Sequence, residues 1–311
     1  MLKKGSGIFF RPRTAKTGAN LAFGLLFGPE TPKEKRKKIP DPFFRAVAVC
    51  AMLIARLVGQ ATADVVAYPD FVEVPAGPFT MGADPAIDPR AFDNEKWSPT
   101  QGEGTVDLPA FFMARHEVTV AQFSAFLLAT KTNADAGATA AAPSHPVTFV
   151  TWPNALAYCR WLEGVLAKTP GAVGDRVRAG WRVSLPTEAQ WEKAARGGDR
   201  RAYPWGDQPR KDRGNFEGTG TTPVGQYACP ECPYGLADMS GNVWEWTSSP
   251  YQPYPYDPSD DRANLDADAL WVMRGGHFAD LARQVRATTR GAADPGARRA
   301  FIGFRVALVQ K

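Results

Sequence analysis

The stretch Tyr234–Thr247, YGLADMSGNVWEWT, decides the fold of this chain, because its composition suits neither a regular helix nor a regular strand. Gly235 and Gly241 allow backbone angles that other residues resist. Asn242 and Glu245 are oxygen donors three residues apart, and such donors suit a hard cation such as Ca²⁺. The competing interpretation is a tightly turned loop, anchored in the core by its tryptophans and holding no ion. The residue types alone leave both interpretations open.

Seven further blocks of sequence flank this stretch in a fixed order. Their residue ranges and sequences are 71–82 (FVEVPAGPFTMG), 117–123 (EVTVAQF), 145–159 (HPVTFVTWPNALAYC), 182–198 (RVSLPTEAQWEKAARGG), 203–207 (YPWGD), 274–278 (RGGHF) and 303–306 (GFRV). Together with GNVWEW, they resemble the formylglycine-generating enzyme family, also called the sulfatase-modifying-factor domain. The resemblance covers residues 68–311. It implies a C-type-lectin-like α+β fold, rich in loops and with few regular elements.

Charge is distributed unevenly along the 311 residues, whose net charge is +5. Residues 1–63 contain 12 Lys and Arg against 3 Asp and Glu, which leaves 25 against 29, a net charge of −4, for residues 64–311. The basic character therefore belongs to the leader. The main domain lacks the basic surface that nucleic-acid binding requires.

The leader has the order of a secretory signal, in which a charged region, an apolar region and a cleavage site follow one another. These regions are Lys33–Lys38, Ala46–Leu57 and Ala61–Ala63. The apolar run is too short for a comfortable membrane span of roughly 20 residues. We therefore predict that residues 1–63 are removed, that residues 64–311 form one domain, and that the protein is periplasmic or secreted. An uncleaved anchor is the alternative.

Local patterns predict helices in the first half of the domain and short strands, turns and loops in the second, hence an α+β fold rather than βαβ units. Thr119 and Thr187 are expected N-caps, and Gln190 completes a capping box with Thr187. The expected elements are a hairpin at 68–82, a loop at 83–107, a strand at 111–113, a surface insertion at 134–142, and helices at about 120–130, 152–168 and 187–197.

The domain contains three cysteines, two of which form the C-x-x-C pair Cys229 and Cys232. A zinc site needs about four ligands, and the sequence offers neither a second C-x-x-C nor a cluster of histidines nearby. In an oxidising compartment we expect a local disulfide. Free thiols and metal binding are the alternatives. Cys159 lies on the apolar face of its expected helix and is predicted to be a buried, small hydrophobic residue.

Catalytic members of the family carry two cysteines after the R-G-G-S block, where they bind copper(I) and activate oxygen. Here the corresponding segment, 277–290, contains no cysteine. Asp280 stands at the position of the first cysteine, the second falls within 281–285, and His277 replaces the family's serine. Thiolates suit soft copper(I), and without them the resemblance does not carry formylglycine formation over to this chain. We expect no copper.

The polar residues at this place suggest a reworked pocket, with His277, Asp280, Arg283 and Trp246 as its candidate residues. If the backbone turns after Phe278, Asp280 can accept a hydrogen bond from one imidazole nitrogen and leave the other facing a cleft. Asp280 would then raise the pKa of His277. The alternative is a hydrogen-bonded histidine beside a turn, with the nearby arginines paired to acidic residues of the fold.

The resemblance also implies structural calcium. The family's G-N-x-W-E loop is matched here by Asn242, the carbonyl of Val243 and Glu245. A second ion site would begin with Asn215 and Phe216, although its acidic partner loop is shortened here to GTGTT.

Two functions from different classes follow from the resemblance. The first is a non-copper accessory or maturation factor that recognises a protein or peptide partner, for example for a periplasmic oxidoreductase such as nitrite reductase. The second is an oxidising enzyme, of the formylglycine type or the siderophore-maturation type, that uses a reworked site at His277 and Asp280. The sequence leaves open whether the protein is an enzyme.

Overall fold

The computed structural model describes residues 8–10, 68–257, 259 and 264–310. The predicted leader therefore lies outside the described residues, apart from the short strand β1 (Ile8–Phe10). The boundary at residue 64 and the removal of the leader stay predictions. Within the described residues, no helix is both long enough and apolar enough to cross a membrane.

Three of the helices begin as their sequences predict. α2 (Val120–Thr130), α3 (Trp152–Leu166) and α5 (Glu188–Arg196) each follow a threonine N-cap whose hydroxyl accepts a backbone N–H in a capping box. These caps satisfy N–H groups that the first turn of a helix leaves without partners. α5 ends at Gly197, as expected. The short helix α4 (Ala172–Arg178) was not predicted, because its seven residues carry no clear apolar period.

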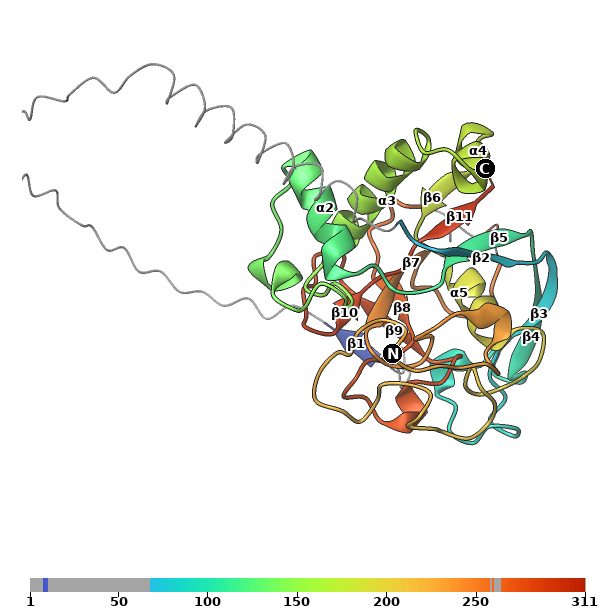
Figure 1. The fold of residues 1–311 in the computed structure, drawn as a ribbon. Helices are drawn as coiled ribbons and strands as arrows, with labels where there is room; N and C mark the ends of the chain where they lie inside the picture. The colour runs from blue at the N-terminus through green and yellow to red at the C-terminus, as the bar shows by residue number, and fades with distance from the viewer. Residues whose placement is uncertain (1–7, 11–67, 258, 260–263, 311) are drawn as a thin grey trace, which may run out of the picture. The chain divides into compact units, whose positions relative to one another are not determined.

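The described strands form three sheets, drawn as arrows in Figure 1. The largest has the order β1-β9-β8-β7-β10, the second β2-β5-β11-β6, and the third pairs β3 with β4. The bounds of the remaining strands are β2 (Phe71–Val74), β3 (Gly77–Gly82), β4 (Glu103–Leu108), β5 (Phe111–Ala114), β6 (Arg182–Ser184), β7 (Trp244–Pro250), β8 (Trp271–Arg274), β9 (Arg290–Ala293), β10 (Ile302–Gly303) and β11 (Ala307–Val309).

The predicted hairpin at 68–82 is wrong, because its two strands belong to different sheets. β2 pairs antiparallel with β5, and β3 pairs antiparallel with β4. Gly77 has a φ of 121° and turns the chain away from β2 between them. The region 83–107 is likewise not wholly a loop, since it contains the 3₁₀ turn η1 (Asp93–Glu95) and most of β4.

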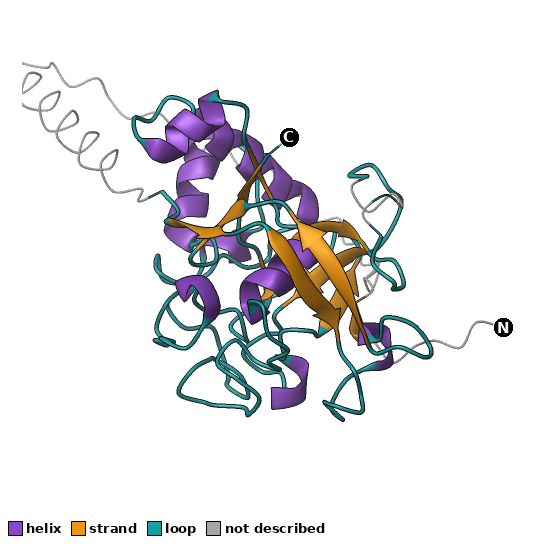
Figure 2. Ribbon diagram, turned by 90° about the vertical axis from the view of Figure 1, so that its right-hand side faces the viewer, coloured by secondary structure: helices purple, strands orange, loops and turns teal. Residues whose placement is uncertain are grey.

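The second half of the domain is mostly loop, as predicted. Figure 2 shows in teal how much of the whole domain lacks regular structure. Its helical content among the described residues is limited to two 3₁₀ turns, η3 (Pro233–Gly235) and η4 (Ala282–Gln284). In the first half, the alanine-rich insertion carries the 3₁₀ turn η2 (Ala136–Thr139), whose Ala138 is fully buried. That insertion is therefore partly anchored in the core.

Tryptophans fill the core between the helices and the largest sheet. Trp152 of α3 stacks on Trp271 of β8 with ring centroids 3.7 Å apart. Trp244 and Trp246 of β7 are both fully buried in the same cluster. The indole N–H of Trp246 donates to the carbonyl of Val150 at 3.0 Å. Such rings combine a large buried area with a polar group that needs a partner, so they fix loops as well as strands.

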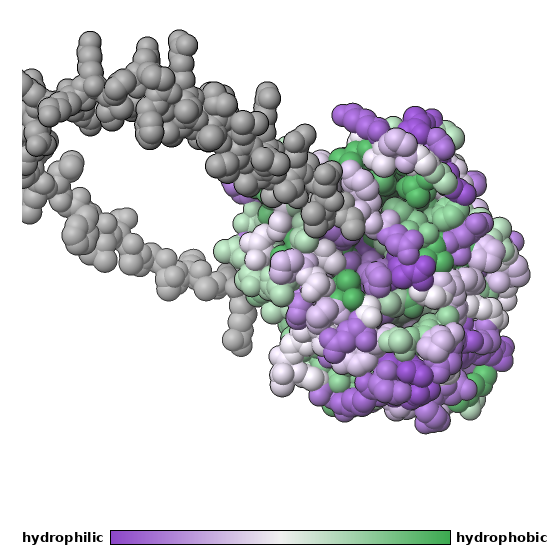
Figure 3. All heavy atoms as spheres, in the orientation of Figure 1, coloured by the Kyte–Doolittle hydropathy of each residue, from purple (hydrophilic) through white to green (hydrophobic). Residues whose placement is uncertain are grey.

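Among the described residues, four fully buried arginines hold the irregular segments together, each facing a buried glutamate, and a fifth, Arg196, shares Glu192 with Arg274. Burying a charge is costly unless it is paired and hydrogen-bonded, so these pairs constrain where the loops can lie. They are Arg274–Glu192, Arg286–Glu95, Arg290–Glu188 and Arg305–Glu245. By contrast, the face seen in Figure 3 mixes hydrophilic and hydrophobic residues across its surface.

Candidate functional site

The stretch that decides the fold forms a tight turn leading into β7. Gly241 has a φ of 92°, and a Cβ atom there would lie 2.1 Å from the carbonyl oxygen of Asn215. Asn242 also has a positive φ, of 61°, and its N–H donates to that same carbonyl at 2.8 Å. Only glycine fits the first position, because any side chain would collide with backbone.

Glu245 is held in a buried ion pair with Arg305. Its two oxygens accept from Nη2 and Nε of Arg305, each at 2.6 Å, and Oε2 also accepts from the indole N–H of Trp191 at 2.7 Å. The charge of this fully buried carboxylate is thus balanced by a guanidinium in a two-point contact, the geometry that makes such pairs strong.

The amide of Asn242 is likewise engaged. Its Oδ1 accepts from Asn215 Nδ2 at 3.2 Å and from the N–H of Thr222 at 3.0 Å, while its Nδ2 donates to Glu117 Oε1 at 3.0 Å. The carbonyl of Phe216 accepts from Lys211 Nζ at 3.1 Å.

The side chains of Asn242 and Glu245 and the carbonyl of Phe216 therefore make other contacts, and this part of the site does not fit the ion as the sequence suggested. Hard cations bind clusters of oxygen ligands that are free to face the ion. Among the described residues, no group of three or more His, Cys, Asp and Glu side chains is arranged to hold a metal. Calcium binding stays a prediction.

Sequence reasoning missed a pair of buried acids beside this turn, Glu117 and Asp238. Burial raises the pKa of both carboxyl groups. The charge of Asp238 raises the pKa of Glu117 further, whereas hydrogen bonds from the Gly225 N–H and from Glu117 oppose the rise at Asp238. The Asp238 carboxylate accepts from the N–H of Gly225 at 2.6 Å. The pair belongs to blocks 121 residues apart in the chain, so no local spacing could have indicated it.

His277 and Asp280 do come together, because the backbone turns after Phe278 as required. The N–H of Asp280 donates to the carbonyl of His277 at 3.0 Å. In return, the His277 N–H donates to Asp280 Oδ2 at 3.0 Å, and His277 Nε2 lies 3.2 Å from Asp280 Oδ1. The two side chains thus form one closed unit at the end of β8.

The other imidazole nitrogen does not face a cleft, contrary to the prediction. Nδ1 of His277 accepts the N–H of Ala279 at 3.1 Å, so Nε2 carries the proton and donates to Asp280. The ring stacks on Phe301 with centroids 4.4 Å apart, and only 13% of the side chain is exposed. Both nitrogens are therefore used within the turn, which leaves neither as a metal ligand or a base in this arrangement.

The predicted direction of the His277 pKa is also wrong. Burial lowers the pKa of His277 to about 4, because the charged imidazolium loses its hydration. Burial likewise raises the pKa of Asp280 to about 6, against the opposing effects of the His277 N–H and the Trp244 indole N–H. The two groups thus favour their neutral forms.

The tryptophan beside Asp280 is Trp244, whereas Trp246 lies in the core against Val150. The Trp244 N–H makes no hydrogen bond of ordinary length to a described residue, so it acts on Asp280 at longer range. Arg283, also predicted for the pocket, is exposed and lies over the ring of Phe92, 4.2 Å from its centroid. The structure therefore brings together only His277 and Asp280 of the four predicted pocket residues.

The cysteines of the described residues lie elsewhere. Cys229 and Cys232 form a disulfide, and Cys159 is a free, buried thiol. Burial raises the pKa of Cys159 far above its ordinary value, which makes it inert. Segment 277–290 contains no cysteine, and the other described cysteines are either cross-linked or buried as a thiol, so this segment supplies none of the soft ligands that copper(I) requires.

Comparison with known proteins agrees with this architecture. A sequence model of the sulfatase-modifying factor enzyme 1-like domain matches residues 57–309. The hercynine oxygenase of Mycolicibacterium thermoresistibile is 33% identical over 276 residues, which cover 74% of this chain and 56% of that one. The formylglycine-generating enzyme of Thermomonospora curvata is 30% identical over 309 residues, covering 76% of this chain and 92% of that one. The chain thus spans little more than half of the hercynine oxygenase.

Among solved structures, PvdO from Pseudomonas aeruginosa superimposes with a TM-score of 0.60 at 26% sequence identity, covering 78% of this chain and 94% of that one. The fold and the matched family model define the class. This chain belongs to the sulfatase-modifying-factor family and has its loop-rich α+β fold.

Proposed function

We propose that this protein is a non-copper member of the family, an exported accessory or maturation factor that recognises a protein or peptide partner. The observation that supports this most is the closed His277–Asp280 turn at the place where the resemblance puts the two thiolates. A site for copper-dependent oxygen activation needs soft ligands and an open coordination position. The turn offers neither, since its side chains bond to each other and to the backbone.

The alternative, an oxidising enzyme that uses His277 and Asp280, has less support. A base or a metal ligand must present a lone pair to the substrate or the ion. Here Nδ1 of His277 is occupied by the Ala279 N–H and Nε2 by Asp280. An enzyme of this kind would have to break both contacts first. We therefore propose recognition of a partner, rather than catalysis, as the function of this protein. We propose the periplasm or the extracellular space as its location.

Oxygen consumption separates the two proposals. The protein is mixed with copper(I), a reductant, oxygen and a sulfatase peptide that contains the target cysteine, and peptide aldehyde is measured by mass. The formylglycine-generating enzyme of Thermomonospora curvata serves as the positive control. We expect no oxygen uptake above the background and no aldehyde. Uptake that disappears in Asp280→Asn would overturn the accessory role and establish the oxidising enzyme.

A further inference from the structure

The disulfide between Cys229 and Cys232 joins residues only three positions apart in a loop, and both cysteines pack against the hydrophobic cluster that contains Tyr203 and Trp205. Cys229 and Cys232 are half-buried, and the neighbouring Ala228, Pro230 and Glu231 are exposed. A cross-link that closes so short a loop removes less entropy from the unfolded chain than one that closes a long loop. Stapling distant parts of the fold is therefore not what this bond achieves.

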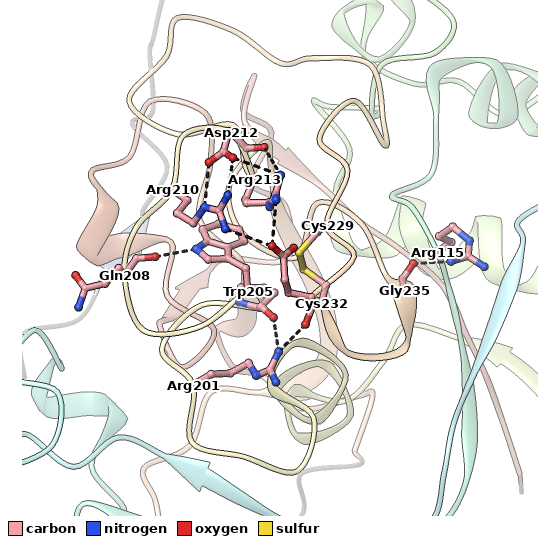
Figure 4. Close-up of a disulfide and its surroundings, with 12 residues drawn as sticks. Arg115, Arg201, Trp205, Gln208, Arg210, Asp212, Arg213, Cys229, Cys232 and Gly235 are labelled. Atoms are coloured by element: carbon pink, nitrogen blue, oxygen red, sulfur yellow. Dashed lines mark hydrogen bonds and ion pairs between the residues drawn. A yellow bond between two sulfur atoms is a disulfide. The ribbon is translucent and has the colours of Figure 1, made fainter.

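The loop is held in place by contacts that do not depend on the sulfur–sulfur bond (Figure 4). The N–H of Cys232 donates to the carbonyl of Cys229 at 3.1 Å. Glu231 lies between the cysteines. Its carbonyl accepts a hydrogen bond from Arg201 Nη1 at 2.8 Å, and its carboxylate accepts one from Arg213 Nη2 at 3.0 Å. If the disulfide opens, these contacts keep the two thiols adjacent, so that the bond can form again readily.

A cavity of about 790 Å³ adjoins this loop, and Glu231 is part of its wall. Charged side chains of both signs dominate the rest of the lining, among them Arg90, Arg201, Asp199 and Asp207. Arg201 and Asp199 pair with each other at 2.6 Å, so the wall is close to neutral. Such a cavity suits a hydrophilic polypeptide segment more than an apolar small molecule.

We propose that Cys229 and Cys232 form a thiol–disulfide exchange centre that oxidises a pair of thiols in a protein substrate. One substrate thiolate attacks a sulfur of the Cys229–Cys232 bond, and the other cysteine leaves as a thiolate that takes up a proton. The second substrate thiolate then attacks the mixed disulfide. The substrate gains a disulfide and loses two electrons and two protons, and Cys229 and Cys232 gain them as two thiols. A small disulfide such as oxidised glutathione restores the centre.

The test uses the full chain and a synthetic peptide with two cysteines, in a buffer of reduced and oxidised glutathione. The matched control is the double variant Cys229→Ser/Cys232→Ser, which keeps Cys50 and Cys159. Substoichiometric wild-type protein is expected to form the peptide disulfide roughly tenfold or more faster than the control. In Cys229→Ser or Cys232→Ser, the remaining cysteine is expected to be trapped as a mixed disulfide with the peptide. Equal rates for wild type and the double variant would overturn the proposal.

The melting temperature of the double variant provides the second measurement. We expect it to stay close to that of the wild type, because the loop is held by Arg201 and Arg213 in either state. A variant that fails to fold would make the bond a structural staple and overturn the exchange centre. The exchange centre rests on the proposed accessory function in one respect only, namely that its substrate is a protein. Its own test, oxygen uptake, does not involve these cysteines, so the two proposals can fail separately.

Discussion

We expect the single variants Asp280→Asn and His277→Gln to change the slope of unfolding free energy against pH in opposite directions. Between about pH 4 and 6 the folded pair consists of a neutral imidazole and a protonated carboxyl group. In the unfolded chain the imidazole is charged and the carboxyl group is ionised over the same range. Both states of the intact pair bind one proton, so the pair itself contributes almost no slope.

The single variants remove this cancellation. The folded pKa of His277 is about 4 rather than 6.5, so its stabilising contribution is complete above pH 6.5 and is lost as the pH falls through 4. The folded pKa of Asp280 is about 6 rather than 3.8, so its contribution is complete below pH 3.8 and is lost as the pH rises through 6. Each difference corresponds to about 3 kcal/mol.

Urea denaturation at intervals between pH 4 and 7 measures the effect as the difference in unfolding free energy from wild type. As the pH rises, Asp280→Asn should become more stable relative to the wild type, by up to about 3 kcal/mol. As the pH falls, His277→Gln should become more stable relative to the wild type by a similar amount. Asp266→Asn, which removes an exposed carboxyl group, controls for the change in net charge. A flat or reversed curve for Asp280→Asn would refute a neutral pair and point to an ionic one.

Two further predictions follow from the stretch that decides the fold. Glu245→Gln leaves the buried Arg305 without its counter-charge and should lower the unfolding free energy by about 3 to 5 kcal/mol in chemical denaturation. Asp175→Asn, at an exposed pair with Arg178, should change it by less than about 1 kcal/mol, and equal losses would contradict the reasoning. Calcium binding, which the resemblance implies, requires Glu245 to face the ion. If Arg305 neutralises Glu245 instead, as in this structure, a calcium chelator should leave the melting temperature unchanged. A clear drop would show that the turn binds an ion.

The parts of the fold that the sequence predicted are those determined by neighbours in the chain. Threonine, two further residues and an amide side chain are enough to mark the start of α5, since the capping box is closed within one turn. β4 and the split between β2 and β3 escaped prediction because strands are defined by partners. The partner of β2 is β5, whereas that of β3 is β4, across a long connection.

The candidate site shows the same limit. That His277 and Asp280 could meet, provided that the backbone turned after Phe278, followed from their spacing of three. That both imidazole nitrogens are occupied depends on Ala279 and on the stacking ring of Phe301, neither of which a motif identifies. Glu245 was predicted as an ion ligand from its residue type and from the resemblance. Its actual partner, Arg305, is 60 residues away in the chain and so was not considered. A long-range ion pair of this kind carries no local signature.

Titration with copper(I) under anaerobic conditions tests whether the His277–Asp280 turn has replaced the family's copper site. The wild type is compared with the double variant His277→Gln/Asp280→Asn in competition with a copper(I) chelator. Both proteins keep the same cysteines, so thiol binding elsewhere cancels. We expect identical titration curves for the two proteins. One equivalent of copper(I) held tightly by the wild type and lost in the double variant would contradict this expectation.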